Sequence, residues 1–384
     1  MNFTITKEMI KNSLVNKGDV ARIVEVIRKA NSGQDISIAF LGGSITEGCN
    51  ATSFEKCYAS RVYSWFKEKF KNININYINA GGGATGSIIG VHRVQKEVLS
   101  KNPDIIFIDF AVNDTESMWD KIGYESLIRR ILSVKKNPAL IEIFMSDCNF
   151  NNVQEQQIEI GKRYNLPMIS FRNAIYQEIK ANKLEWNQVS DDEIHPNDYG
   201  HFIIAELLID FINNIINNII NNIINNIINN IINNLDGQGK DKVELGAPLY
   251  GDKYISGKIL NNKNLQVSYV NDFLEDNEGF QVFKEGWRYI SDNGGKATLI
   301  FEVEGKNIFL LYKKSIKKTA GKLHVKVDGT KAMLVNTYFK GGWGEYAETR
   351  ILVNDLEIGK HKVEIRVVDE EKPVEVRVMG LLVS

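Results

Sequence analysis

A serine and a histidine of this chain stand in segments from which they could carry out acyl transfer. Ser44 lies in LGGSITEG (41–48), directly after an apolar run, and His195 lies in the polar segment SDDEIHPN (190–197). A serine nucleophile needs a base to take its proton, and the base needs an acid to orient it. Asp192 stands three residues before His195, a spacing that lets a carboxylate reach the imidazole within one turn. These three residues are therefore candidates for a catalytic triad.

Other interpretations of the same residues remain open at this point. The serine segment is not a G-x-S-x-G nucleophile elbow, because Thr46 replaces the last glycine, and no lysine follows as a P-loop requires. Ser44 or Thr46 could instead cap a helix. A metal site at Asp192 and His195 lacks further histidine or cysteine ligands, so we expect no metal. The remaining histidines fit structural positions better: His92, His201, His324 and His361.

Acyl transfer also needs hydrogen-bond donors for an oxyanion. Asn113 directly follows the apolar run IIFIDFAV (105–112), so its amide could point across the strand ends toward Ser44; the alternative is a turn-forming Asn-Asp pair. The loop INAGGGATGS (78–87) offers free backbone N–H groups after another predicted strand. Its G-x-G-x-x-G spacing also matches a dinucleotide fingerprint, with Asp104 at the distance of a ribose contact. That fingerprint normally follows the first strand and not the second, so we expect no nucleotide cofactor.

Taken together, four segments resemble the sequence blocks of the SGNH, or GDSL-type, hydrolase superfamily. LGGSITEG is similar to the first block, INAGGGATGS to the second, AVNDTE (111–116) to the third and DDEIHPNDYGH (191–201) to the last. The resemblance covers about residues 35–212 and implies a flavodoxin-like α/β/α fold. It also implies the roles of the residues. Ser44 would be the nucleophile and its N–H an oxyanion donor, His195 the base with Asp192 as its partner, and Asn113 the side-chain donor to the oxyanion.

Two positions depart from the family pattern. Gly43 stands where the family has the aspartate of Gly-Asp-Ser. Because that aspartate lies outside the triad, we expect a local change in packing and no loss of activity. In the second block, Ala84 matches the oxyanion glycine and Gly83 precedes it. A backbone N–H serves with or without a methyl group provided that φ is permitted, so the donor in this loop is Gly83 or Ala84.

The elements that must position these residues alternate along the first half of the chain. Apolar runs predict strands at 36–41, 73–78, 105–112, 139–145 and 167–171. Helical spacing of apolar residues predicts helices at about 19–30, 58–70, 87–99, 124–136 and 151–164. This alternation indicates a parallel sheet covered by helices on both faces, with ligands beyond the carboxyl ends of its strands.

The chain changes character after these elements. FINN and five copies of IINN occupy residues 211–234. The tract is either a helical spacer or oligomerisation surface, or, as we prefer, an expanded repeat that extends the preceding helix. Alternating apolar runs over about 240–384 predict an all-β, jelly-roll-like sandwich. We therefore predict an SGNH-type α/β hydrolase domain at 1–235, ending in the repeat helix, and a β-sandwich domain at 236–384.

Aromatic residues of the β-rich region have two interpretations. They could form a saccharide-binding face, which would make the second domain carbohydrate-binding, or they could belong to the core and the ordinary surface, which we prefer. The residues concerned are Trp287, Tyr289, Tyr338, Phe339, Trp343 and Tyr346.

Composition limits the partners and the compartment. The net charge of −1 gives no sign of nucleic-acid binding. Three cysteines are too few for a disulfide framework and fit a reducing compartment. The N-terminal segment has no apolar core of a signal peptide, and the repeat tract is too polar to span a membrane. We expect a cytoplasmic protein, with homo-oligomerisation open.

The sequence thus predicts a serine esterase that forms an acyl-enzyme with small acyl esters, including O-acetyl groups of saccharides. A lipid-ester hydrolase or thioesterase is an alternative with the same chemistry. A saccharide-binding protein with a non-catalytic SGNH domain is an alternative of another class.

Overall fold

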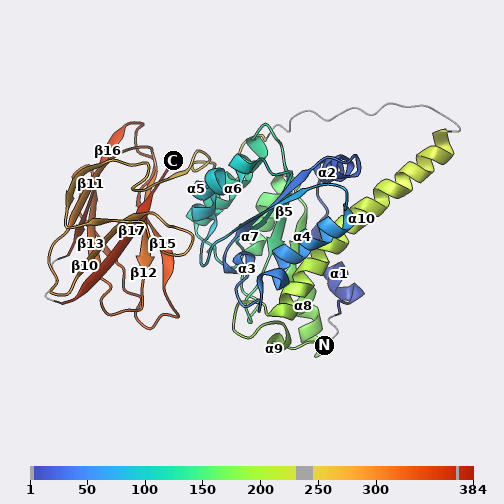
Figure 1. The fold of residues 1–384 in the computed structure, drawn as a ribbon, viewed down its shortest axis with the longest axis horizontal. Helices are drawn as coiled ribbons and strands as arrows, with labels where there is room; N and C mark the ends of the chain where they lie inside the picture. The colour runs from blue at the N-terminus through green and yellow to red at the C-terminus, as the bar shows by residue number, and fades with distance from the viewer. Residues whose placement is uncertain (1–3, 231–244, 369–371) are drawn as a thin grey trace. The chain divides into compact units, whose positions relative to one another are not determined.

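The computed structural model describes residues 4–230, 245–368 and 372–384. The chain forms two units, one made of residues 1–81 and 96–252 and the other of residues 82–95 and 253–384. The first contains a mostly parallel sheet with helices, and the second contains antiparallel sheets (Figure 1). The predicted fold class, an α/β domain followed by an all-β domain, is therefore confirmed. The predicted boundary at residues 235 and 236 lies outside the described residues.

Five parallel strands form the sheet of the first unit, in the order β3-β2-β4-β5-β6, which is the flavodoxin-like order. The central strands are buried along their whole length, as parallel strands between two helical layers must be. A short strand that the sequence did not predict, β1 (Leu14–Asn16), pairs antiparallel with β6 at the edge. The parallel strands are β2 (Ile36–Gly42), β3 (Ile75–Gly81), β4 (Ile105–Asp109), β5 (Ala139–Phe144) and β6 (Met168–Ser170).

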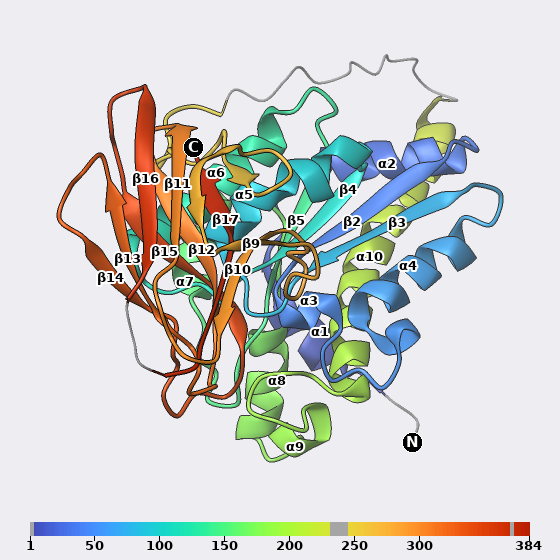
Figure 2. The same ribbon diagram turned by 60° about the vertical axis from the view of Figure 1, so that its left-hand side comes forward.

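Helices cover both faces of this sheet (Figures 1 and 2). On one face a shared core joins the apolar sides of α1 (Lys7–Ser13), α2 (Ala21–Asn31), α4 (Tyr58–Lys69), α8 (Phe171–Lys180) and α10 (Asp198–Asn230). The other face carries α6 (Met118–Ser133) and α7 (Gln154–Arg163). The remaining helices are α3 (Ser44–Glu47), α5 (Ser87–Glu97) and α9 (Trp186–Val189), with two short 3-10 helices, η1 (Phe54–Lys56) and η2 (Leu99–Lys101).

The strand register brings the carboxyl ends of three strands side by side. Gly42, the last residue of β2, pairs with Gly81 at the end of β3 and with Asp109 at the end of β4. The segments that follow these strands are the three loops that the sequence singled out.

The repeat tract continues helix α10 through Asn230, and residues 231–234 lie outside the described residues. Ile215 and Ile216 are buried in the core of the first unit, whereas Ile220 is 47% exposed. The stretch Asp198–Asn221 is long and apolar enough to cross a membrane, but more than half of its most apolar window is buried within the protein. It is therefore placed as a core helix.

The second unit contains two antiparallel sheets whose inner faces form one core. One sheet has the order β15-β12-β17-β10-β9, with β7 beside β17, and the other has the order β14-β13-β16-β11-β8. Their strands alternate buried and exposed residues, which is the pattern of a sandwich. The strands are β7 (Lys258–Leu260), β8 (Val267–Asn271), β9 (Leu274–Asp276), β10 (Gly286–Ser291), β11 (Thr298–Glu304), β12 (Ile308–Lys314), β13 (Lys322–Val327), β14 (Met333–Asn336), β15 (Tyr346–Val353), β16 (Lys360–Val367) and β17 (Val374–Val383).

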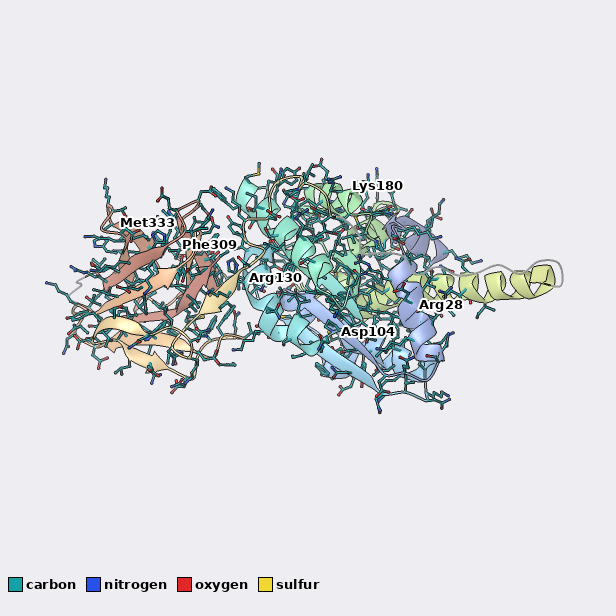
Figure 3. All side chains as sticks on the ribbon, turned by 90° about the horizontal axis from the view of Figure 1, so that it is seen from above. Arg28, Asp104, Arg130, Lys180, Phe309 and Met333 are labelled. Atoms are coloured by element: carbon teal, nitrogen blue, oxygen red, sulfur yellow. The ribbon has the colours of Figure 1, made fainter. Side chains whose placement is uncertain are left out.

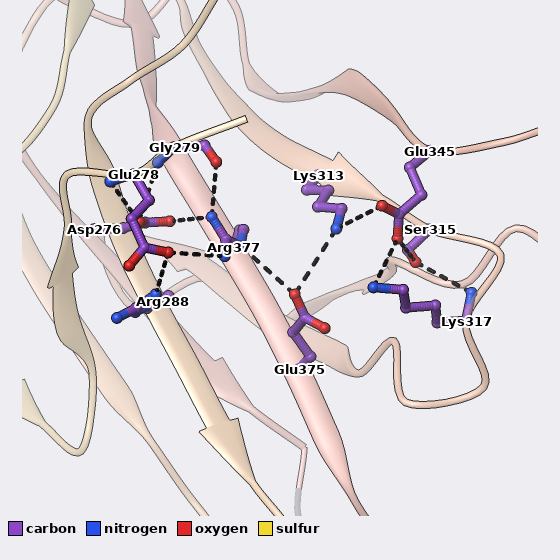
Figure 4. A network of polar contacts seen from close by, with 10 residues as sticks. All are labelled: Asp276, Glu278, Gly279, Arg288, Lys313, Ser315, Lys317, Glu345, Glu375 and Arg377. Carbon is purple, nitrogen blue, oxygen red and sulfur yellow. Dashed lines mark hydrogen bonds and ion pairs between the residues drawn. The ribbon is translucent and has the colours of Figure 1, made fainter. Parts of the chain in front are cut away.

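A network of ion pairs connects strands of the first of these sheets with one another and with the residue before β15 (Figure 4). Arg377 on β17 pairs with Asp276 on β9 at 2.8 Å, and Lys313 on β12 pairs with Glu345 at 2.8 Å. Glu375 connects the two halves through contacts with Lys313 and Arg377. Because each of these charges has a partner of opposite sign, none of them is left uncompensated, and removing one partner of a buried pair should destabilise the sheet.

Candidate active site

Ser44 begins helix α3 directly after β2, so its side chain lies at the carboxyl end of a central strand, where the sequence placed it. Gly43 is the N-cap with extended backbone, and Gly48 ends the helix with a φ of 107°. The strand also ends in a glycine for a steric reason. A β-carbon on Gly42 would lie 2.3 Å from Thr46 Oγ1, so the helix could not turn back against the strand end.

The three residues predicted as a triad form a hydrogen-bonded series. Ser44 Oγ lies 3.0 Å from His195 Nε2, and His195 Nδ1 lies 2.8 Å from Asp192 Oδ2. With Nδ1 donating to the carboxylate, neutral His195 has its lone pair on Nε2, facing the serine hydroxyl. In this form the imidazole can accept the proton of Ser44, which is the arrangement of a serine hydrolase.

The Asp192 carboxylate is held by its own loop. Its Oδ1 accepts the backbone N–H groups of Ile194 at 2.7 Å and of His195 at 2.6 Å, while its Oδ2 accepts from the imidazole. Burial acts to raise the pKa of Asp192, but these hydrogen bonds outweigh it and lower the pKa below the ordinary value. Asp192 is thus ionised at neutral pH and can stabilise an imidazolium.

The loop itself is fixed at both ends. Ser190 and Pro196 form an isolated antiparallel bridge, and Trp186 Nε1 donates to the carbonyl of Asp192 at 2.7 Å. The Ser190 hydroxyl also lies 2.7 Å from the carbonyl of His195. These contacts hold the base in place without using its side chain.

His195 has a raised pKa, about 9 compared with an ordinary value of 6.5. The nearby Cys49 side chain makes the largest contribution, burial acts in the opposite direction, and Asp192 raises the pKa further. Cys49 was not predicted from the sequence, because its proximity to the base depends on how the loop after α3 folds.

Asn113 forms a turn, which was one of the two interpretations left open, and its side chain lies near the nucleophile segment. Its backbone N–H and that of Asp114 both donate to the carbonyl of Phe110, so the pair does form a turn. Its side chain meanwhile lies against Gly43, the residue before Ser44. The turn therefore directs the amide to the nucleophile segment, and the donation to an oxyanion stays a prediction.

Gly83 and Ala84 lie in a turn closed by the Thr85 N–H, which donates to the carbonyl of Gly82 at 3.2 Å. Gly83 is buried, whereas Ala84 has a φ of 55°, in the left-handed region that few residues other than glycine adopt. Such a conformation costs free energy and is often found at functional sites. The choice between the two N–H groups as oxyanion donor stays a prediction.

Asp104 does not fit the role of a ribose contact. It lies directly before β4, at the amino end of the sheet, whereas the glycine loop follows the carboxyl end of β3 (Figure 3). Its carboxylate pairs with Lys29 at 2.9 Å and Lys136 at 2.8 Å and accepts the N–H of Ser37. Asp104 is therefore a structural residue, which supports the interpretation of the glycine pattern as accidental.

His92 and His361 have structural partners. His92 Nδ1 lies 2.6 Å from the carbonyl of Ile88 within α5, and His361 pairs with Asp328 at 2.7 Å. Among residues 4–230, 245–368 and 372–384, no group of three or more His, Cys, Asp or Glu side chains could hold a metal ion.

The aromatic residues of the β-rich region divide between core and surface. Trp287 and Tyr289 are buried in the sandwich core. Phe339, Trp343 and Tyr346 instead contact one another near the surface, and Trp343 is 72% exposed. Core packing therefore accounts for only part of the aromatic content.

Comparison with known proteins agrees with this geometry. Residues 40–203 match the model of the GDSL-like lipase/acylhydrolase family. Two crystal structures of a two-domain esterase active on acetylated mannans, one of them co-crystallised with mannopentaose, are similar over nearly the whole chain. Each is 31% identical with a TM-score of 0.85; the alignments cover 98% of this chain and 97% and 98% of the two esterase chains. No curated protein sequence matches the chain.

The chain therefore belongs to the GDSL-like lipase/acylhydrolase family, and it is a carboxylic ester hydrolase with an added C-terminal β domain.

Proposed function

We propose that this protein removes acetyl groups from saccharides through an acyl-enzyme on Ser44. The observation that carries the proposal is the series of Ser44, His195 and Asp192, with contacts of 3.0 and 2.8 Å at the carboxyl edge of the sheet. The substrate is suggested by the similar esterase, which is active on acetylated mannans and resembles this chain across both domains.

The proposed reaction has two steps, each with His195 as the proton carrier. In the first, His195 takes the proton of Ser44 while Oγ attacks the acetyl carbonyl, and then gives the proton to the departing sugar oxygen. In the second, His195 takes a proton from a water that attacks the acyl-enzyme, and it returns this proton to Ser44 Oγ as the bond to the acyl carbon breaks and acetate leaves. Asp192 stabilises the imidazolium in both steps.

The oxyanion of each step is proposed to receive hydrogen bonds from three directions. The donors are the N–H of Ser44, the N–H of Gly83 or Ala84, and the carboxamide of Asn113. Donors fixed in position before the reaction stabilise the developing charge without reorganising, which makes them a large contribution to the rate.

The β domain is proposed to bind the saccharide. The rings of Trp343 and Tyr346 stack with centroids 5.2 Å apart, and Phe339 contacts both. An exposed aromatic cluster of this kind suits the apolar face of a sugar ring. Titration calorimetry with a manno-oligosaccharide tests this: Trp343→Ala should weaken binding, and an unaltered affinity would contradict the assignment.

A cytoplasmic location is proposed with this function. Cys49, Cys57 and Cys148 are all free thiols, which suits a reducing compartment.

Labelling of Ser44 by an organophosphate tests the function directly. The wild-type protein should be labelled at Ser44 and lose esterase activity, while Ser44→Ala and His195→Ala should each be folded and nearly inactive. Because triad members act as a unit, the double variant should be scarcely worse than either single one. Retention by Ser44→Ala of more than about a tenth of wild-type turnover on an aryl acetate would contradict the mechanism.

A series of esters with increasing acyl chain length separates the alternative functions. An acetylesterase should prefer acetate, whereas a lipid-ester hydrolase or thioesterase should prefer longer acyl chains.

A further inference from the structure

We propose that Asn50 and His201 are positioning residues that hold the nucleophile and the base at their working distance. They act through the loop of residues 48–50, which follows the nucleophile helix and contacts the segment that carries the base. The inference rests on the proposed function, since it assigns a role in the reaction of Ser44 with His195.

The loop is hydrogen-bonded directly to the backbone of Ser44. The backbone N–H groups of Gly48 and Cys49 both donate to the carbonyl of Ser44, at 3.1 and 2.9 Å. Two left-handed residues then shape the loop, Gly48 with a φ of 107° and Asn50 with a φ of 69°. The Ala51 N–H closes it onto the Gly48 carbonyl at 3.2 Å. A displacement of this loop is therefore transmitted to Ser44 through its own carbonyl.

Asn50 connects the loop to the base. Its Nδ2 donates to the backbone carbonyl of His195 at 3.0 Å. The same carbonyl is approached at 2.7 Å by the hydroxyl of Ser190, which belongs to the loop of the base. A carbonyl oxygen has two lone pairs and can accept both hydrogen bonds. His195 is thus held by its own loop on one side and by the nucleophile loop on the other.

His201 holds the loop at a second point. Its ring is fully buried and stacks on Tyr58, with centroids 6.1 Å apart and planes inclined by 13°. The backbone N–H of Tyr58 donates to Nδ1 at 3.3 Å, so Nε2 carries the ring proton and donates to the carbonyl of Cys49 at 3.1 Å. Burial lowers the pKa of His201 to about 4, so the neutral ring is the form present at neutral pH.

The hydrogen bonds of Asn50 and His201 connect the 48–50 loop to the segment of the base at two points. One continuous segment carries His195 and His201, and it meets the 48–50 loop at both residues. The hydrogen bond that Ser44 Oγ donates to His195 Nε2 then joins the same two segments at the reacting atoms. Since a misplacement of about 1 Å can lower a rate about a hundredfold, contacts that fix these segments to one another affect kcat. The proposal gives neither residue a contact with substrate, so KM should change little.

Two substitutions at Asn50 separate the hydrogen bond from the shape of the loop. Asn50→Gly keeps a residue that adopts a positive φ freely but removes the carboxamide. Asn50→Asp keeps the size but places a carboxylate oxygen against the carbonyl of His195. Both should lower kcat for a small aryl acetate by about tenfold and slow the labelling of Ser44 by an organophosphate to a similar extent, with KM within a few-fold. The matched control is Asn102→Gly, an exposed asparagine with a φ of 49°, which should keep wild-type kcat.

Two substitutions at His201 test the second contact. His201→Gln can keep a donor to the carbonyl of Cys49, whereas His201→Phe keeps a ring against Tyr58 and removes both nitrogens. The glutamine variant should retain more kcat than the phenylalanine variant when both are compared at equal folded fraction. The inference is overturned if Asn50→Gly and Asn50→Asp both keep wild-type kcat, or if the two His201 variants differ in thermal stability but not in kcat. A Ser44→Ala variant that stays active would instead overturn the proposed function, so the two failures are distinguishable.

Discussion

Gly43 and Asn113 are packed so closely that a side chain at residue 43 would require the Asn113 carboxamide to move. A β-carbon at this position would lie 2.1 Å from Asn113 Oδ1 and 3.0 Å from its Cγ, distances shorter than any ordinary contact. The aspartate that the family pattern has at this position would therefore displace the Asn113 carboxamide. Glycine at residue 43 thus leaves the Asn113 carboxamide in its observed position.

This relationship predicts that adding a single methyl group to Gly43 damages catalysis. Gly43→Ala should push the Asn113 amide out of place and lower kcat about ten- to a hundredfold, because an oxyanion donor that is misplaced loses part of its effect. Gly43→Asp should be at least as damaging. Steady-state kinetics on an aryl acetate measure the effect, and Gly359→Ala, where a β-carbon meets open space, is the control. Wild-type kcat in Gly43→Ala would show that Asn113 is not needed where it stands.

Removing the Asn113 carboxamide should act on kcat and leave binding nearly unchanged. An oxyanion forms only in the transition state, so loss of one donor typically lowers turnover on the order of 10²- to 10³-fold while the ground-state ester is bound as before. Asn113→Ala should show this pattern with KM within a few-fold, and Asn113→Asp should be no better because a carboxylate would face the developing charge. A large increase in KM at normal kcat would recast Asn113 as a substrate-binding residue. A large loss of stability would mean that the turn at Phe110 is its main role.

The sequence could predict the sheet because each strand is a separate apolar run and each intervening helix has its own spacing. The boundaries were less accurate where a polar cap decides them. Helix α6 begins at Met118 and not near Tyr124, because Ser117 caps it by accepting the N–H of Asp120. The edge strand β1 was not predicted, since its three residues become a strand only by pairing with β6.

The hydrogen-bonded arrangement of Ser44, His195 and Asp192 could be predicted for a similar reason, because Asp192 and His195 are neighbours in sequence and the serine segment has a recognisable form. The contacts that hold these three residues in place could not be predicted from the sequence. Asn50 and His195 are 145 residues apart, and no local pattern indicates that a carboxamide after α3 will meet the carbonyl of the base. The same applies to Cys49, whose sulfur affects the base only once the two loops are folded together.

Cys49 leads to a prediction about pH. His195 must be neutral to accept a proton, and its pKa is raised to about 9, so kcat/KM should increase with pH through the neutral range and level off above about pH 9. The Cys49 side chain makes the largest contribution to the raised pKa of His195. Cys49→Ala should therefore shift the midpoint of the pH profile to lower pH. Asp192 should still keep the pKa of His195 above its ordinary value of 6.5. Cys148→Ala, the control, should leave the midpoint unchanged. An unshifted profile in Cys49→Ala would show that the sulfur does not act on the base.

Residues 245–252, which follow the repeat tract in sequence, are held to the first unit by contacts of their own. These contacts lead to a prediction about the repeat. The carboxylate of Glu125 on α6 is fully buried and accepts the N–H groups of Leu249, Tyr250 and Gly251 at 2.6, 2.6 and 2.9 Å. Arg129, one turn further along α6, pairs with Asp252 at 3.0 Å and donates to the carbonyl of Gly246 at 3.0 Å. This segment is therefore held by contacts with α6 that no residue of the repeat makes.

Removing one IINN repeat, residues 223–226, should accordingly leave kcat and KM unchanged. The repeat carries no acid, base or nucleophile, and it lies beyond Ile215 and Ile216, which the core of the first unit uses. Glu125→Gln is the informative contrast, because an amide NH₂ group brought among three N–H donors would leave buried groups unpaired and should lower the melting temperature by several degrees. Thermal unfolding and steady-state kinetics on both variants decide the matter. A folded repeat-deletion variant with reduced kcat would show that the tract contributes to the site. A Glu125→Gln variant of wild-type stability would show that Glu125 is not needed to hold residues 245–252.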